Sequence, residues 1–134
     1  MFRNYDEWLE QVPERIQKDS LWSFVTYRKA LFLADLAWFD SEKFQNDYRG
    51  KGLSSQLVCS AGSVSANIEE GYGRGYGKDY ARFLRIALGS ARETKGWYFR
   101  GRHIIDQTVV GHRMDLIDEI VKSLVITADQ QRRR

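Results

Sequence analysis

The stretch that decides the fold runs from Tyr80 to Tyr98 and reads Tyr-Ala-Arg-Phe-Leu-Arg-Ile-Ala-Leu-Gly-Ser-Ala-Arg-Glu-Thr-Lys-Gly-Trp-Tyr. Its apolar positions recur at steps of four and three residues, which aligns them along one side of an α-helix. A half-buried strand would alternate apolar and polar residues with a period of two, and the stretch does not. It therefore predicts a helix whose buried stripe consists of Tyr80, Leu84, Ala87, Ala91, Thr94 and Tyr98.

Three further stretches carry the same spacing, and short segments rich in glycine separate them. Their apolar stripes are Phe24, Tyr27, Leu31, Ala34 and Trp38; Leu53, Leu57, Ala61, Val64 and Ile68; and Met114, Ile117, Val121, Leu124 and Ala128. Four helices of about 20 residues with short turns between them predict an all-α protein, an up-down-up-down antiparallel four-helix bundle. An extra short helix is expected between Asn4 and Pro13.

The length of 134 residues, with 43% hydrophobic side chains, fits a single domain. We predict that it spans residues 1–134, with an N-terminal arm or short helix at 1–19 and a frayed basic tail at 129–134. No apolar run is long enough to cross a membrane, and the N-terminus does not resemble a signal peptide. With a lone Cys59, expected as a small core residue, these features indicate a cytoplasmic protein.

Beside these stripes, several helices carry a second apolar row that one four-helix bundle does not need. Either the N-terminal helix covers this row or a second copy of the chain does, and we predict self-association. The expected interface residues are Trp22, Phe32, Leu36, Phe83, Ile86 and Trp97.

Positive charge is concentrated in the middle of the chain, where residues 48–113 carry eleven basic and five acidic side chains, a net +6. At 100° per residue, four cations of the helix at 78–98 fall within about 80° of arc, opposite its apolar stripe. Such a face predicts contact with nucleic-acid phosphates, and the alternative is an ordinary solvated face. The candidate residues are Arg74, Lys78, Arg82, Arg85, Arg92 and Lys95.

A polar stripe on the preceding helix and a glycine-rich loop after it are the other marked features. The stripe, Gln56, Ser63, Asn67 and Glu70 together with Ser60, is expected to pair across a helix interface; its alternative role is a contact surface. The loop 71–77 matches no known phosphate-binding spacing, so we expect a left-handed helix cap and a tight turn. Tyr72 and Tyr76 within it are candidates for base stacking.

Catalysis has little support in the sequence. His103 and His112 lie nine residues apart, no Glu-x-x-His pair is present, and one cysteine does not build a zinc site. We therefore expect no metal, no cofactor and no enzymatic activity.

Two strings, Asn67-Ile68-Glu69-Glu70-Gly71 and Phe83-Leu84-Arg85-Ile86-Ala87-Leu88-Gly89-Ser90, carry a family resemblance that extends over about residues 22–126. The chain resembles the bacterial four-helix-bundle family of proteins encoded in intervening sequences of large-subunit ribosomal RNA genes and of accessory proteins of diversity-generating retroelements. The resemblance implies a homopentameric ring with a basic surface for RNA or DNA and, in retroelements, a reverse-transcriptase partner. Where the family usually carries one or two arginines after the glutamine, this chain has Val58 and Cys59.

Together, the residues and the resemblance predict a non-catalytic, homo-oligomeric accessory protein that binds RNA or single-stranded DNA. The alternatives are an oligomeric scaffold that binds only proteins, and an unrecognised enzyme.

Overall fold

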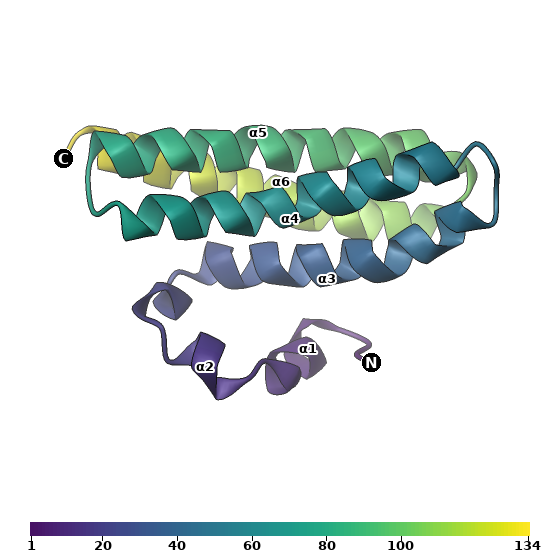
Figure 1. Cartoon of the computed structure of the whole chain (residues 1–134), viewed down its shortest axis with the longest axis horizontal. Coiled ribbons are helices and arrows are strands. Elements are labelled where there is room, and N and C mark those ends of the chain that lie inside the picture. Colours follow the sequence, from purple (N-terminus) through teal and green to yellow (C-terminus); the bar gives the residue numbers. More distant parts are fainter.

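The computed structural model describes all 134 residues and contains helices but no strands. Two short helices, α1 (Tyr5–Gln11) and α2 (Glu14–Gln17), and the 3-10 turn η1 (Ser20–Ser23) precede the bundle. The four long helices are α3 (Val25–Gln45), α4 (Lys51–Gly73), α5 (Lys78–Arg100) and α6 (Gln107–Arg132), and the 3-10 turn η2 (Gly101–His103) follows α5. These four lie side by side, with short turns at alternate ends (Figure 1). The predicted all-α class is confirmed.

The apolar stripes predicted for α4 and α5 form the centre of the bundle. On α5 all six predicted positions are buried, and on α4 only Leu53 is partly exposed. On α6 Ile117, Leu124 and Ala128 are buried, and Met114 and Val121 pack against the same core. The spacing of apolar residues was therefore a sufficient signal for these three helices.

The predicted stripe of α3 was only partly correct. Tyr27 is in the core, and Phe24 and Leu31 pack against it. Trp38, however, is 62% exposed, and the remaining core positions are Ala30, Leu33, Ala37 and Phe44. Because α3 is apolar around most of its circumference, periodicity alone did not indicate which row faces the other long helices. Cys59, expected in the core, is also exposed. It lies on the outer side of α4, opposite Leu57 and Ala61.

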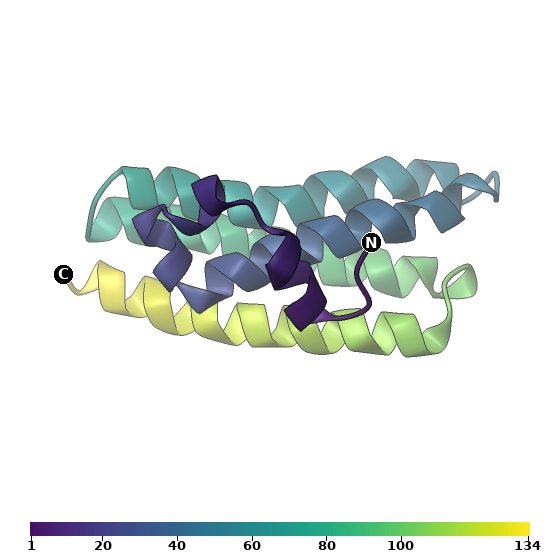
Figure 2. The same ribbon diagram turned by 90° about the horizontal axis from the view of Figure 1, so that it is seen from below.

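The N-terminal segment covers the second apolar row of α3. Trp8 of α1 packs with Phe32 and Leu36 in a separate small core, to which Leu116 of α6 also contributes. The Trp8 indole donates a 2.7 Å hydrogen bond to Asp35. Figure 2 shows this segment crossing over α3 towards α6. Phe32 and Leu36, predicted to contact another copy, are therefore buried within the chain, so their assignment to an oligomer interface was wrong.

A buried polar network connects α3, α5 and α6 near the C-terminal ends of α3 and α5. The Asp40 carboxylate accepts hydrogen bonds from Tyr98 Oη at 2.7 Å, Arg113 Nε at 2.8 Å and Arg113 Nη2 at 3.1 Å. Asp40 is only 6% exposed. Burial, together with the adjacent Asp40, raises the pKa of Tyr98, so its hydroxyl stays a donor. A charge at this depth is tolerated because every polar atom of the network has a partner.

The α4–α5 turn forms as the glycines predict. Gly75 and Gly77 have φ angles of 97° and 83°, in the left-handed region where a side chain is strained. The Gly77 amide donates to Gln131 Oε1 of α6 at 3.0 Å, which fastens the turn to the end of that helix. Contrary to the predicted frayed tail at 129–134, α6 remains helical to Arg132, and Asp129 pairs there with Arg132 and Arg133 at 3.0 Å.

Candidate nucleic-acid interface

The basic face lies on the outer side of α5, the helix at the top of Figure 1. Lys78, Arg82, Arg85 and Arg92 are all exposed, because the buried stripe occupies the opposite side of this 23-residue helix. At 1.5 Å per residue, the first and last of them are about 21 Å apart along the axis. Gly89 sits among them, and a side chain at that position would meet nothing within 4 Å. The face is therefore open along its length.

Three of the six predicted cations are partly neutralised by carboxylates. Arg82 Nη2 lies 3.3 Å from Asp79, and Arg74 lies 3.7 Å from Glu70 and 3.9 Å from Asp79. Lys95 Nζ lies 2.6 Å from Asp118 of α6. These pairs are solvent-exposed and therefore weak.

The other three cations, Lys78, Arg85 and Arg92, have no carboxylate within 4.0 Å. They are the groups of α5 most available to an external phosphate. The sequence did not distinguish the two sets, because one of the partners, Asp118, comes from another helix.

Two arginines also cover the ring of Phe83, one of the residues predicted for an oligomer interface. The guanidinium carbons of Arg74 and Arg82 lie 5.1 Å and 4.5 Å from the ring centroid. Trp97 is covered in the same way by Arg100 at 4.9 Å, and its indole donates to Glu93. Ile86, which lies between Phe83 and Trp97 in the sequence, is 42% exposed.

Trp22, the remaining predicted interface residue, is partly buried and packs near Trp8, with ring centroids 6.5 Å apart. Thus, of the six predicted interface positions, Ile86 is the one that offers a substantial exposed apolar side chain.

At its centre, the polar stripe of α4 pairs across a helix interface, as expected from the sequence. Ser63 accepts hydrogen bonds from Ser90 of α5 at 2.9 Å and from Asn67 at 2.9 Å, and Ser60 accepts from Thr94 at 3.0 Å. The bonds from Ser90 and Thr94 connect α5 to α4, whereas the bond from Asn67 lies within α4. The two ends of the stripe differ: Gln56 is exposed, and Glu70 is exposed and pairs with Arg74.

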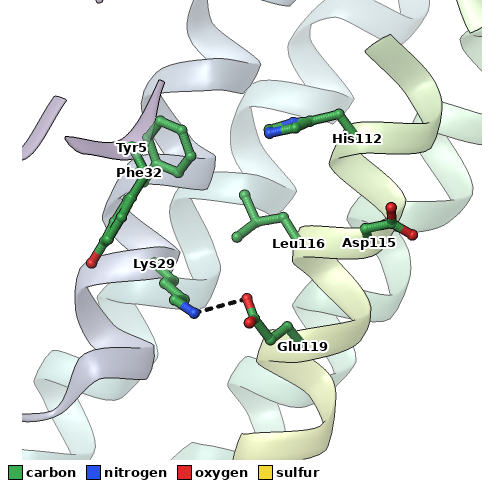
Figure 3. Close-up of a pocket in the computed structure, with 7 residues that line it drawn as sticks. All are labelled: Tyr5, Lys29, Phe32, His112, Asp115, Leu116 and Glu119. Carbon is green, nitrogen blue, oxygen red and sulfur yellow. Dashed lines mark ion pairs between the residues drawn. The ribbon is translucent and has the colours of Figure 1, made fainter. Parts of the chain in front are cut away.

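A cleft beneath the N-terminal arm holds His112. It has a volume of about 370 Å³ and lies between α1, α3 and α6. Figure 3 shows Tyr5, Lys29, Phe32, His112, Asp115, Leu116 and Glu119 around it, with a 2.9 Å ion pair between Lys29 and Glu119.

The surroundings of His112 do not form a metal site. Partial desolvation of its ring and the adjacent Arg113 guanidinium lower the pKa of His112. Its Nδ1 faces Arg113 Nη1 at 2.7 Å, which opposes a proton on that nitrogen. No cluster of three histidine, cysteine or acidic side chains in the structure has the geometry to bind a metal.

Comparison with known proteins finds a family and a solved structure that match this architecture. The family model of the 23S rRNA-intervening sequence protein matches residues 23–125, from the end of η1 to near the end of α6. The chain belongs to the 23S rRNA-intervening sequence protein family. A crystal structure at 1.70 Å of a protein of unknown function from the S23 ribosomal protein family of Bacteroides thetaiotaomicron VPI-5482 is also similar. It has 25% sequence identity and a TM-score of 0.70, and the match covers 75% of this chain and 95% of that chain. A search of curated proteins finds no match.

The 23S rRNA-intervening sequence protein family match begins after α1 and α2, so the arm that covers Phe32 and Leu36 lies outside it. The basic face and the polar contacts between α4 and α5 lie inside it. No helix of the structure has the length and hydropathy of a membrane span.

Proposed function

We propose that this chain is a non-catalytic accessory protein of the cytoplasm that binds RNA or single-stranded DNA through the outer face of α5. The observation that carries the proposal is the row of Lys78, Arg85 and Arg92, exposed on one rigid helix without carboxylate partners. Phosphate contacts of this kind provide affinity without reading sequence. The family description, which refers to sequences that intervene in 23S rRNA, supports RNA as the partner.

One protomer carries a formal charge of only +3, so a single basic face attracts a polyanion weakly. We propose that the chain acts as a homo-oligomer, a pentamer as the resemblance implies, so that several α5 faces engage one strand together. Such avidity raises the overall affinity without any new contact.

The surface between α5 and α6 supports assembly. Leu88, Val125 and Ile126 line a cleft of about 490 Å³, and the latter two are 46% and 50% exposed. On the outer side of α4, side chains added at Gly52 or Gly62 would meet nothing within 4 Å, so a neighbouring backbone can approach closely there. Exposed apolar groups such as those between α5 and α6 are typical of interaction sites.

The retroelement side of the resemblance suggests a second setting for the same face. We propose that a reverse transcriptase is a partner of the oligomer where one is encoded nearby, with the α5 faces contacting the nucleic acid that the enzyme holds.

The test of binding is a fluorescence-anisotropy titration with a labelled single-stranded RNA at low salt. The variant Arg85→Glu/Arg92→Glu should lose binding, because it reverses the two unpaired cations in the middle and second half of α5. The control Lys43→Glu/Lys51→Glu changes the net charge equally at exposed positions outside that helix and should retain binding. Sedimentation of each variant shows whether the oligomer persists.

A protein-binding scaffold is the second candidate, and the carboxylates paired with Arg74, Arg82 and Lys95 favour it because they weaken the positive field. An oligomer that binds no RNA or DNA strand at low salt would refute nucleic-acid binding and leave the scaffold as the better candidate.

A further inference from the structure

An aromatic cavity lies at the end of the bundle where the α4–α5 turn, the start of α3 and the end of α6 meet. This end of the bundle is on the left in Figure 1. Its volume is about 590 Å³. Four rings line it, those of Phe24, Tyr72, Tyr76 and Tyr80, together with the polar side chains of Ser23, Thr127 and Gln131. Flat apolar walls with a few polar groups are the usual composition of a small-molecule site.

The rings are held at different depths. Tyr80 is 6% exposed, and burial together with Tyr72 raises the pKa of Tyr80 to about 12, so it is neutral. Tyr72 meets Tyr80 edge-on with centroids 6.1 Å apart, and its hydroxyl lies 2.6 Å from Ser20 Oγ. These contacts fix two walls of the cavity before any ligand enters.

Tyr76 is the open wall, because it is 75% exposed on the tight turn. The guanidinium carbon of Arg134 already lies 4.5 Å from its ring centroid, so this ring accepts a planar group in the free protein. The second face of an exposed tyrosine is available for stacking in the same way.

The polar edge of the cavity offers donors. Gln131 Oε1 accepts the Gly77 amide at 3.0 Å, which fixes the orientation of the side-chain amide and leaves Nε2 without a hydrogen-bond partner in the structure. An amide held in this way suits the carbonyl and ring-nitrogen acceptors of a nucleobase edge.

Two basic residues lie next to residues that form the cavity and its turn. Lys78 follows Gly77 directly and has no carboxylate within 4.0 Å, and Arg134 lies over Tyr76. The acidic side chains of Glu70 and Asp79, on either side of the turn, are both engaged by Arg74. A negatively charged backbone can therefore pass this end of the bundle and continue onto the α5 face, which begins at Lys78.

We propose that this cavity takes one unpaired nucleobase of a single strand, stacked on Tyr76 and read at its edge by Gln131, while the flanking phosphates contact Lys78 and Arg134. The inference rests on the proposed function and adds a base-binding pocket to a face that otherwise contacts only phosphates. A base in a duplex is stacked and paired, so this site selects single strands.

The test compares a labelled 12-nucleotide single-stranded RNA, the DNA strand of the same sequence, the RNA duplex and an abasic strand of the same length. Wild-type protein should prefer either single strand with bases to the duplex and to the abasic strand. Tyr76→Ala should weaken binding of the strand with bases about tenfold and leave the abasic strand unchanged, because one stacking platform is lost and no phosphate contact is. Tyr76→Phe should retain binding, because the ring is kept.

Tyr48 provides the matched control. It is 83% exposed on the α3–α4 turn at the other end of the bundle, and Arg49 lies over its ring at 5.6 Å, as Arg134 lies over Tyr76. Tyr48→Ala should leave all four affinities unchanged. Equal losses in Tyr48→Ala and Tyr76→Ala would overturn the inference.

The outcomes separate this inference from the proposed function. Salt-dependent binding that Tyr76→Ala does not alter would refute the base pocket and leave the phosphate-binding face intact. Displacement of the strand by tetramethylammonium but not by nucleoside monophosphates would show an aromatic cage for a quaternary cation and also overturn the base pocket. Absence of binding to every strand at low salt would refute the function itself.

Discussion

Replacing Asp40 with leucine should lower the free energy of unfolding by about 3 to 5 kcal/mol, the range for breaking a buried ion pair from one side. The Asp40 carboxylate accepts from both Tyr98 and Arg113, and it is 6% exposed. Leucine has the same number of side-chain heavy atoms in the same branched arrangement, so the change creates no cavity. The cost comes from the partners that remain.

The magnitude follows from how deeply those partners lie. The Arg113 side chain is 14% exposed, so its guanidinium regains little hydration when the carboxylate is removed. Tyr98 is fully buried, and an unpaired hydroxyl there costs about 1 to 3 kcal/mol. The two penalties share one acceptor and do not add fully, which keeps the expected total within the range for a broken buried pair.

A compensating variant separates a charge effect from a packing defect. Adding Arg113→Met and Tyr98→Phe to Asp40→Leu removes every polar atom of the network, and apolar replacement of buried ion pairs is often neutral or stabilising. The triple variant should therefore recover most of the stability that Asp40→Leu loses.

The assay is urea unfolding followed by far-ultraviolet circular dichroism at one protomer concentration, because assembly shifts apparent stability. Asp118→Leu is the matched control, since it breaks the exposed pair with Lys95 and should cost less than about 1 kcal/mol. If Asp40→Leu unfolds at the same urea concentration as Asp118→Leu, the network does not hold the three helices together.

Three further outcomes are expected from the packing and the cleft. Ala87→Leu should lower the unfolding free energy by about 1 to 3 kcal/mol, because the position is fully buried in the bundle core; an unchanged thermal melt would contradict that placement. Trp8→Ala should uncover Phe32 and increase binding of the dye ANS at nearly constant helical content, whereas unchanged dye binding would show that the arm does not cover this row. The folded state lowers the pKa of His112, so the unfolded chain binds more protons and stability should fall as the pH drops through about 6.5. His112→Gln should show a smaller fall in urea midpoint between pH 8 and pH 5 than the wild type, and equal falls would exclude this contribution.

The sequence determined the bundle more fully than it determined the surfaces. The helices α4 and α5 were predicted correctly because their apolar residues form one clear stripe, from Leu57 to Ile68 and from Tyr80 to Tyr98. The register of α3 was not, because which of its two rows is covered depends on Trp8, more than twenty residues upstream. Cys59 was misplaced for a different reason: its residue type suggested burial, whereas the spacing of α4 already puts it opposite Leu57 and Ala61.

Part of the candidate site could be predicted from the sequence. Helical spacing correctly placed Lys78, Arg85 and Arg92 on an exposed face of α5, but the pair between Lys95 and Asp118 depends on how α5 packs against α6. Periodicity did contain a signal for the buried network, since Asp40 occupies the same side of α3 as Ala37 and Phe44. A charged residue in a core stripe needs a partner, and that expectation alone indicates that a basic side chain lies opposite.

The salt dependence of single-stranded RNA binding tests the central claim most directly. The logarithm of the wild-type affinity should fall linearly with the logarithm of the salt concentration, with a slope of about −0.7 for each phosphate contacted. Arg85→Ala/Arg92→Ala removes two such contacts per engaged protomer and should make the slope shallower by about 1.4 for each protomer engaged. A salt slope identical in the wild type and this double variant would contradict phosphate binding by the α5 face.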